Sequence, residues 1–138
     1  MKNLTNQKGF TLIELMTTVL ILGIIALISA NIYSGYVRKG RRVDAVNSLL
    51  SMSLAEERYR SSNASYGTLA QAWNNQSTSQ EGFYTLAISN VSSTAYTLTA
   101  TAVGNQVNDA ENGTSCSTIT LSVSNGTITK SPAACWPT

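Results

Sequence analysis

Lys-Gly-Phe-Thr-Leu-Ile-Glu, at residues 8–14, is the stretch that decides how this chain is organised. A basic leader ends at Gly9, and an apolar stretch begins at Phe10 without a gap. The only charged residue between Phe10 and Val37 is Glu14. A helix of about 20 predominantly apolar residues is long enough to cross a bilayer. Residues 10–32 are therefore predicted to form a membrane-spanning helix.

The order of leader and apolar stretch predicts that this helix is kept. An ordinary secretory signal is cut after its apolar region, which is then lost. Here the natural break lies between Gly9 and Phe10, before the apolar region. We expect residues 1–9 to be removed as a leader and the helix to remain in the mature protein.

Glu14 is unusual because a carboxylate within an apolar span is costly, and such residues generally have a partner or a function. An alternative is that Glu14 lies close enough to the helix end to reach the lipid headgroups. Its position alone leaves both interpretations open.

Residues 9–16, Gly-Phe-Thr-Leu-Ile-Glu-Leu-Met, resemble the type IV prepilin family, which includes type IV pilins and the pseudopilins of type II secretion. The resemblance implies that a prepilin peptidase cuts after Gly9 and methylates the new N-terminus at Phe10. It also implies that Glu14, at the fifth mature position, meets the N-terminal amine during subunit assembly.

Charge is distributed unevenly along the chain. From Val43 onward six acidic residues face three basic ones, which argues against a generally basic nucleic-acid-binding head. The best sequence evidence for DNA capture is a cluster just before Val43, here called the basic neck. The alternative is a solvated or headgroup-contacting neck on the helix. The basic neck consists of Arg38, Lys39, Arg41 and Arg42.

The basic neck also conflicts with the expected orientation. Only Lys2 and Lys8 precede the apolar stretch, so a count of positive charges places the C-terminal side in the cytoplasm. The leader indicates the opposite orientation, and so does a disulfide that we expect between the two cysteines of the chain, Cys116 and Cys135. Both are more specific than a charge count, and we expect the head to lie in the periplasm.

The chain has no histidine and only two cysteines, Cys116 and Cys135. We expect no catalytic residue, no metal site and no cofactor. Two cysteines behind an export-type anchor favour one disulfide. Closing the loop of residues 117–134 would stabilise the head by roughly 3 kcal/mol. The alternative is a pair of free buried thiols.

The helix is expected to continue beyond the membrane as an amphipathic half, residues 33–61. Four apolar residues recur there at helical spacing and predict the face that packs on the core. A polar cluster at residues 61–63 is expected to end the helix. The four residues are Val43, Val46, Leu50 and Leu54.

Residues 62–138 are predicted to form a globular head. An irregular connection at 64–82 includes a short helical turn around Leu69–Trp73, and Trp73 is expected to pack within it. Alternation of polar and apolar residues then predicts four strands, and Asn125–Gly126 predicts a tight hairpin. Packing the helix stripe on an antiparallel sheet of about four strands gives an α+β fold. The expected strands are Phe83–Ile88, Tyr96–Val103, Ser117–Val123 and Thr127–Lys130.

This layout is similar to that of type IVa pilins. Residues 57–59 and 96–101 and the closing Cys135-Trp136 resemble PilE-type minor pilins. The resemblance implies a C-terminal loop, the D-region, bounded by Cys116 and Cys135. One departure is Asn31, which stands at the twenty-second mature position where many pilins have a proline.

Together these features predict a minor pilin that helps to initiate a type IV pilus or is incorporated into it, for adhesion, twitching motility or DNA uptake. The alternatives are a major pilin, a type II secretion pseudopilin, a DNA-binding competence pilin, and an anchored periplasmic protein that never assembles. The expected partners are other pilin subunits, prepilin peptidase and the inner-membrane assembly machinery. The expected location is the bacterial inner membrane as a single-pass protein, then the cell-surface pilus.

Overall fold

The computed structural model describes residues 9–137, without the side chains of residues 27–32. The chain divides into two compact units, Met1–Ser34 and Gly35–Thr138. One helix, α1, runs over Leu12–Ser62 and takes part in both. Residues 1–8 of the predicted leader and the side chain of Asn31 lie outside the described residues.

The first unit consists, from Leu12 on, of the N-terminal part of α1. From Leu12 to Ile25 its large apolar side chains are exposed around the helix, with exposed fractions from 52% at Ile24 to 76% at Leu12, and Phe10, just before the helix, is 82% exposed. Within the part of the chain that the structure describes, no helix combines the length and apolar content needed to cross a membrane.

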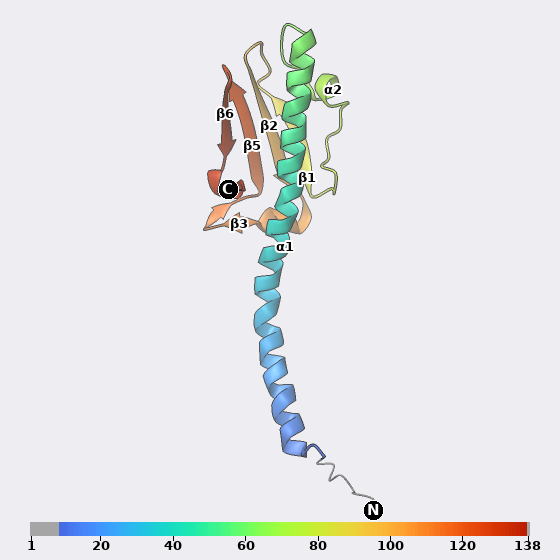
Figure 1. The fold of residues 1–138 in the computed structure, drawn as a ribbon, viewed down its shortest axis with the longest axis vertical. Helices are drawn as coiled ribbons and strands as arrows, with labels where there is room; N and C mark the ends of the chain where they lie inside the picture. Colours follow the sequence, from blue (N-terminus) through green and yellow to red (C-terminus); the bar gives the residue numbers. More distant parts are fainter. Residues whose placement is uncertain (1–8, 138) are drawn as a thin grey trace, which may run out of the picture. The chain divides into compact units, whose positions relative to one another are not determined.

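The second unit, the head, contains a four-stranded antiparallel sheet in the order β1-β2-β5-β6, covered by the C-terminal half of α1 (Figure 1). The predicted α+β fold is confirmed. A small two-stranded ladder, β3-β4, and two short helices, α2 and η1, lie in the connections, and a third short helix, η2, follows β6. The elements are α2 (Leu69–Ala72), β1 (Tyr84–Ser89), β2 (Ala95–Ala102), η1 (Gly104–Asn108), β3 (Ala110–Glu111), β4 (Thr114–Ser115), β5 (Thr118–Ser124), β6 (Thr127–Ser131) and η2 (Ala133–Cys135).

Alternating sequence sets the register of the sheet. In β2 every second residue from Tyr96 to Ala102 is buried, and Leu98 lies opposite Leu121 of β5. Asn125 and Gly126 close the β5–β6 hairpin with φ of 50° and 79°. Positive φ at both central residues is the requirement of the tight turn that asparagine and glycine favour.

The buried face of α1 differs from the predicted stripe. Leu49 is 0% exposed, whereas Val43, Leu50 and Leu54 are 53%, 45% and 53% exposed; of the predicted stripe only Val46 is buried. The core face also holds charged side chains that have partners in the head, so a count of apolar spacing selects the wrong face. The buried helix residues are Arg42, Asp44, Ala45, Val46, Ser48, Leu49, Met52 and Glu56.

Glu56 joins the end of α1 to the connection that follows. Its side chain is fully buried, and its Oε2 accepts a hydrogen bond of 2.8 Å from the backbone N–H of Gly67. A Cβ on Gly67 would lie 3.0 Å from Cδ1 of Tyr59, so a side chain here would crowd the Tyr59 ring. Burial raises the pKa of the Glu56 carboxyl, and the Gly67 hydrogen bond opposes this shift only in part.

Every residue of the hydrophobic core belongs to Gly35–Thr138, as do both cysteines. The head therefore contains its own core and is expected to fold without the residues that precede it. Trp73 packs against this core from the α2 region, as predicted.

The register of α1 predicts a sharp contrast between two adjacent leucines. In a head fragment of residues 35–138, Leu49→Ala should lower the free energy of unfolding by about 2–5 kcal/mol, because it leaves a cavity in the core. Leu50→Ala should cost less than about 1 kcal/mol. Urea denaturation monitored by circular dichroism measures both. Equal losses, or a larger loss for Leu50→Ala, would contradict the observed face.

Candidate assembly surfaces

The N-terminal end of α1 is held by a capping box. Thr11 precedes the first helical residue, and its Oγ1 accepts a hydrogen bond of 3.3 Å from the N–H of Glu14. The Glu14 Oε2 in turn accepts from the N–H of Thr11 at 3.5 Å. This reciprocal pattern satisfies N–H groups that have no partner within the helix. The Glu14 carboxylate also lies near the positive end of the helix dipole, where a negative charge is stabilised.

The capping box gives Glu14 a local role that the sequence interpretation missed. The Thr-Leu-Ile-Glu pattern at residues 11–14 is the sequence signature of a capping box and would have predicted this role. Both contacts of the Glu14 carboxylate with Thr11 are long, at 3.5 Å, and exposed to solvent. The structure therefore leaves this carboxylate accessible. Gly9 and Phe10 lie just before the helix and are both exposed.

A buried ion pair fastens α1 to the loops of the head. Arg42 is 5% exposed and binds Asp109 through two hydrogen bonds, of 2.7 Å and 2.9 Å. It also donates to Glu111 at 3.0 Å, and Lys39 donates to the other oxygen of Glu111 at 2.9 Å. The bond to Asp109 raises the pKa of Arg42, and the bond from Lys39 is the main cause that lowers the pKa of Glu111. We call these four residues the neck clamp.

Three of the four cations of the basic neck, Lys39, Arg41 and Arg42, therefore have partners in the head. Arg42 and Lys39 are neutralised by acidic residues that lie about 70 positions further along the chain. The Arg41 guanidinium lies 4.5 Å from the centre of the Phe83 ring. Both sequence interpretations treated these cations as exposed, and for Arg42 this was wrong. No local spacing in the sequence pairs Arg42 with Asp109.

The predicted disulfide is confirmed. Cys116 and Cys135 are bonded and almost fully buried, with their Cα atoms 5.6 Å apart. The backbone N–H of Cys116 donates to the carbonyl of Asp109 at 2.8 Å. The disulfide and the neck clamp are thus joined through one short segment. Together they hold the C-terminal loop in place.

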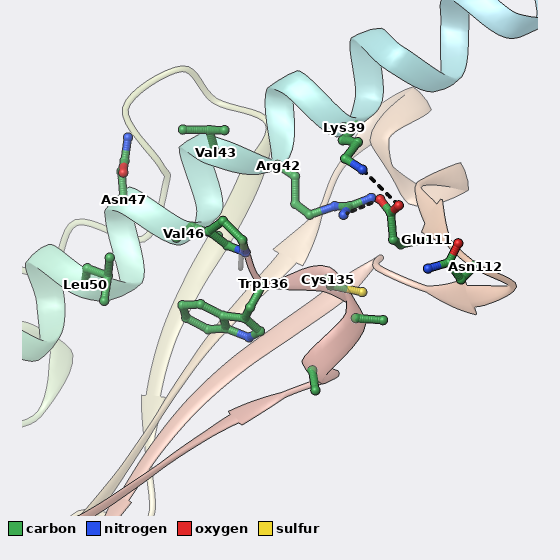
Figure 2. Close-up of a pocket in the computed structure, with 13 residues that line it drawn as sticks. Lys39, Arg42, Val43, Val46, Asn47, Leu50, Glu111, Asn112, Cys135 and Trp136 are labelled. Carbon is green, nitrogen blue, oxygen red and sulfur yellow. Dashed lines mark hydrogen bonds and ion pairs between the residues drawn. The ribbon is translucent and has the colours of Figure 1, made fainter.

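A groove of about 730 Å³ lies between α1 and this C-terminal loop (Figure 2). The neck clamp borders it at one end, where Lys39 and Arg42 reach Glu111. Trp136 is largely buried and forms part of one wall. The side chains that line the groove are mostly apolar. It is lined by Lys39, Arg42, Val43, Val46, Asn47, Leu50, Glu111, Asn112 and Ala133–Pro137.

A second hollow, of about 590 Å³, lies on the α2 side of the same helix. It shares Val43 and Asn47 with the first. The other residues that line it are mainly amides, hydroxyls and acids. They are Gly40, Asp44, Ser48, Ser51, Trp73, Gln76, Thr78, Gln80, Glu81 and Leu86.

The neck clamp predicts that replacing Arg42 lowers the stability of the head much more than replacing Lys39. Arg42→Met leaves Asp109 buried without a counter-charge, which should cost the head about 3–5 kcal/mol of unfolding free energy. Lys39→Met removes a partner that is 60% exposed and should cost less than about 1 kcal/mol. Chemical denaturation of the head fragment measures both. Adding Asp109→Asn to Arg42→Met should restore part of the loss, and an Arg42→Met head as stable as the Lys39→Met head would rule the clamp out.

Two protein-family models match this chain. The model for the type IV minor pilin ComP, DNA uptake sequence receptor, matches residues 32–120, which is well over half of the 138 residues. The model for the prokaryotic N-terminal methylation motif matches residues 4–30. No curated protein matches the chain. The methylation motif, the helix-on-sheet head and the first model agree, and the chain belongs to the type IV minor pilin family that the ComP model describes.

Proposed function

We propose that this pilin is stored in the inner membrane by residues 10–32, cut between Gly9 and Phe10, methylated at Phe10, and then built into a type IV pilus as a minor subunit. One observation carries this proposal: an apolar helix exposed on all sides has a single, accessible carboxylate, Glu14, within one turn of its start. The match of the methylation motif to residues 4–30 supports the processing steps.

The physical argument concerns what surrounds the helix. Each buried methylene contributes about 0.8 kcal/mol, so moving this helix from lipid into water would be prohibitive. Helices of neighbouring subunits can replace lipid as the apolar surroundings. In such a bundle the Glu14 carboxylate would meet the Phe10 amine of the next subunit. At a site of low dielectric constant this pairing would fix the axial position of the subunits.

Two substitutions at Glu14 separate assembly from helix capping. Glutamine also completes a capping box, so Glu14→Gln keeps the cap but removes the charge. We expect both Glu14→Gln and Glu14→Ala to reduce the amount of this pilin in sheared fibres by about tenfold or more, since each leaves the amine without its counter-charge. Quantitative mass spectrometry of fibres measures the loss and also identifies the processed N-terminus.

Total cellular levels of the variants, and their cleavage after Gly9, serve as controls for synthesis and processing. If Glu14→Gln enters fibres normally while Glu14→Ala does not, the role of Glu14 is capping alone. If the unaltered protein is missing from fibres, the proposed function is wrong.

A second candidate function, DNA binding by the displayed head, is favoured by the description of the matching family model as a DNA uptake sequence receptor. Because Lys39 and Arg42 are paired with acidic residues and Arg41 lies over Phe83, we look for phosphate-binding cations near the end of α1. Arg58 is exposed, and Arg60 joins the helix end to the β1–β2 turn through the carbonyl of Ser93 at 3.2 Å. Adhesion and twitching motility remain predictions from the family resemblance.

DNA binding by the head fragment of residues 35–138 should be salt-dependent. Replacing one phosphate-contacting cation, as in Arg58→Gln, should weaken binding to all duplexes and reduce the slope of log affinity against log salt by about 1. Fluorescence anisotropy over a range of salt concentrations measures this. Lys39→Gln is the matched control, because Lys39 is already paired with Glu111. The absence of salt-dependent binding by the unaltered head would exclude this function.

A further inference from the structure

The second hollow, on the α2 side of α1, has one wall made by the connection between α2 and β1, and this wall is fixed in place. Asp44 of α1 accepts hydrogen bonds from the Ser79 hydroxyl at 2.5 Å and from the backbone N–H of Glu81 at 3.2 Å. A β-bridge between Thr78 and Thr85 joins the same connection to β1. The hollow of about 590 Å³ is therefore preformed, and its volume is typical of a small-molecule site.

The polar side chains that line this hollow are not engaged elsewhere in the head. The amides of Asn47, Gln76 and Gln80 are exposed and make no hydrogen bond within the described part of the chain. Ser48 is only 8% exposed, yet its hydroxyl has no hydrogen-bond partner among the described residues. A buried polar group costs free energy until it gains a partner. Ser48 therefore indicates, independently of the shape of the hollow, a ligand that forms hydrogen bonds.

The charges of the hollow disfavour an anionic occupant. Asp44 and Glu81 are the only charged residues that line it, and both are acidic. Among the described residues the Glu81 carboxylate has no ion-pair partner. A phosphate, a nucleic acid or an acidic sugar would meet negative charge that no cation offsets. The ligand should therefore be neutral or positively charged.

The mixture of donors and acceptors then favours a neutral ligand. An ammonium group only donates hydrogen bonds, so the amide N–H groups of the hollow would gain nothing from it. Sugar hydroxyls both donate and accept, as do the amides and the serine hydroxyls that line the hollow. Trp73 also lines it and is partly exposed, and an indole ring offers an apolar surface for the C–H groups of a sugar ring.

We propose that the second hollow is a binding site for an uncharged saccharide. Trp73 contacts the apolar face of a sugar ring, and the amides of Asn47, Gln76 and Gln80 bind its hydroxyls. Ser48 gains there the hydrogen-bond partner that it lacks within the chain. Binding of this kind goes beyond the proposed function and does not depend on it, because the hollow lies within one subunit.

The first test locates the site by NMR, with the isotope-labelled full-length chain in a zwitterionic detergent that contains no sugar. The neutral probes are maltose, cellobiose, lactose and N,N′-diacetylchitobiose. The chain has two tryptophans, and they line different hollows: Trp73 lines the second, and Trp136 lines the groove beside the C-terminal loop. At least one probe should shift the indole N–H signal of Trp73, with a Kd of about 1 mM or tighter, and leave that of Trp136 in place.

The Trp73→Phe variant assigns the two indole signals. If none of the four disaccharides shifts the Trp73 signal, or if each that does so shifts the Trp136 signal equally, the saccharide site is ruled out. Two charged probes check the class of ligand. Glucuronate should not bind, and spermidine should shift the Trp73 signal less than the best disaccharide does. A tighter Kd for either charged probe would overturn the assignment.

Two matched serine-to-arginine variants test the hollow itself. Ser51 is exposed on α1 and lines the hollow, so Ser51→Arg should occupy the space and weaken binding of the best disaccharide by about tenfold or more. Ser62→Arg makes the same change at an exposed position of α1 that does not line the hollow, and it should bind as the unaltered chain does. Gln80→Ala removes one amide and should weaken binding by about threefold to tenfold, the effect of one hydrogen bond.

Circular dichroism and disulfide formation show that each variant is folded. Unchanged binding by Ser51→Arg would contradict the proposed site, and so would equal losses in Ser51→Arg and Ser62→Arg. All of these measurements use the isolated chain, so their failure is distinct from absence of the pilin from fibres, which would contradict the proposed function alone.

Discussion

The bidentate ion pair between Arg42 and Asp109 is the interaction that fixes α1 to the C-terminal part of the head. It joins the neck of α1 to the segment before β3, and the Asp109 carbonyl in turn binds the N–H of Cys116. Through Cys116 the connection reaches the disulfide, and through Cys135 it reaches the loop that borders the groove. A helix that lies on a sheet has freedom to slide along its axis. The two hydrogen bonds between the Arg42 guanidinium and the Asp109 carboxylate oppose this sliding, because a shift of the helix would leave two buried charges without partners.

The same helix has two parts whose surfaces differ. From Leu12 to Ile25 its large apolar side chains are exposed on all sides. Its second part buries one face in the core, with Leu49 and Met52 completely covered, and leaves Val43 and Leu50 on the other face. The chain therefore displays apolar surface both along the first part of the helix and in the groove beside the C-terminal loop.

Much of this fold could be predicted from the sequence, because sheet alternation and turn chemistry are local. The alternation around Leu98 and the Asn125–Gly126 turn were sufficient to place β2 and the β5–β6 hairpin within one or two residues. The core face of α1 was not predictable from apolar spacing, since its buried residues include Arg42 and Glu56, whose partners are distant in sequence. At the N-terminal end of the helix the opposite holds: the capping box is entirely local.

The buried carboxyl of Glu56 makes the head sensitive to acidity in a direction opposite to that of an exposed ion pair. Because its pKa is raised on folding, the folded head holds a proton that the unfolded chain has released, at pH values between the ordinary value of 4.5 and the raised one. Unfolding across that interval releases the proton, so mild acidification favours the folded head. The lowered pKa of Glu111 acts the other way, and its contribution is lost only as the pH falls through that lowered value. Glu56 therefore favours the folded head at mildly acidic pH, and the loss of the Glu111 contribution opposes this at lower pH.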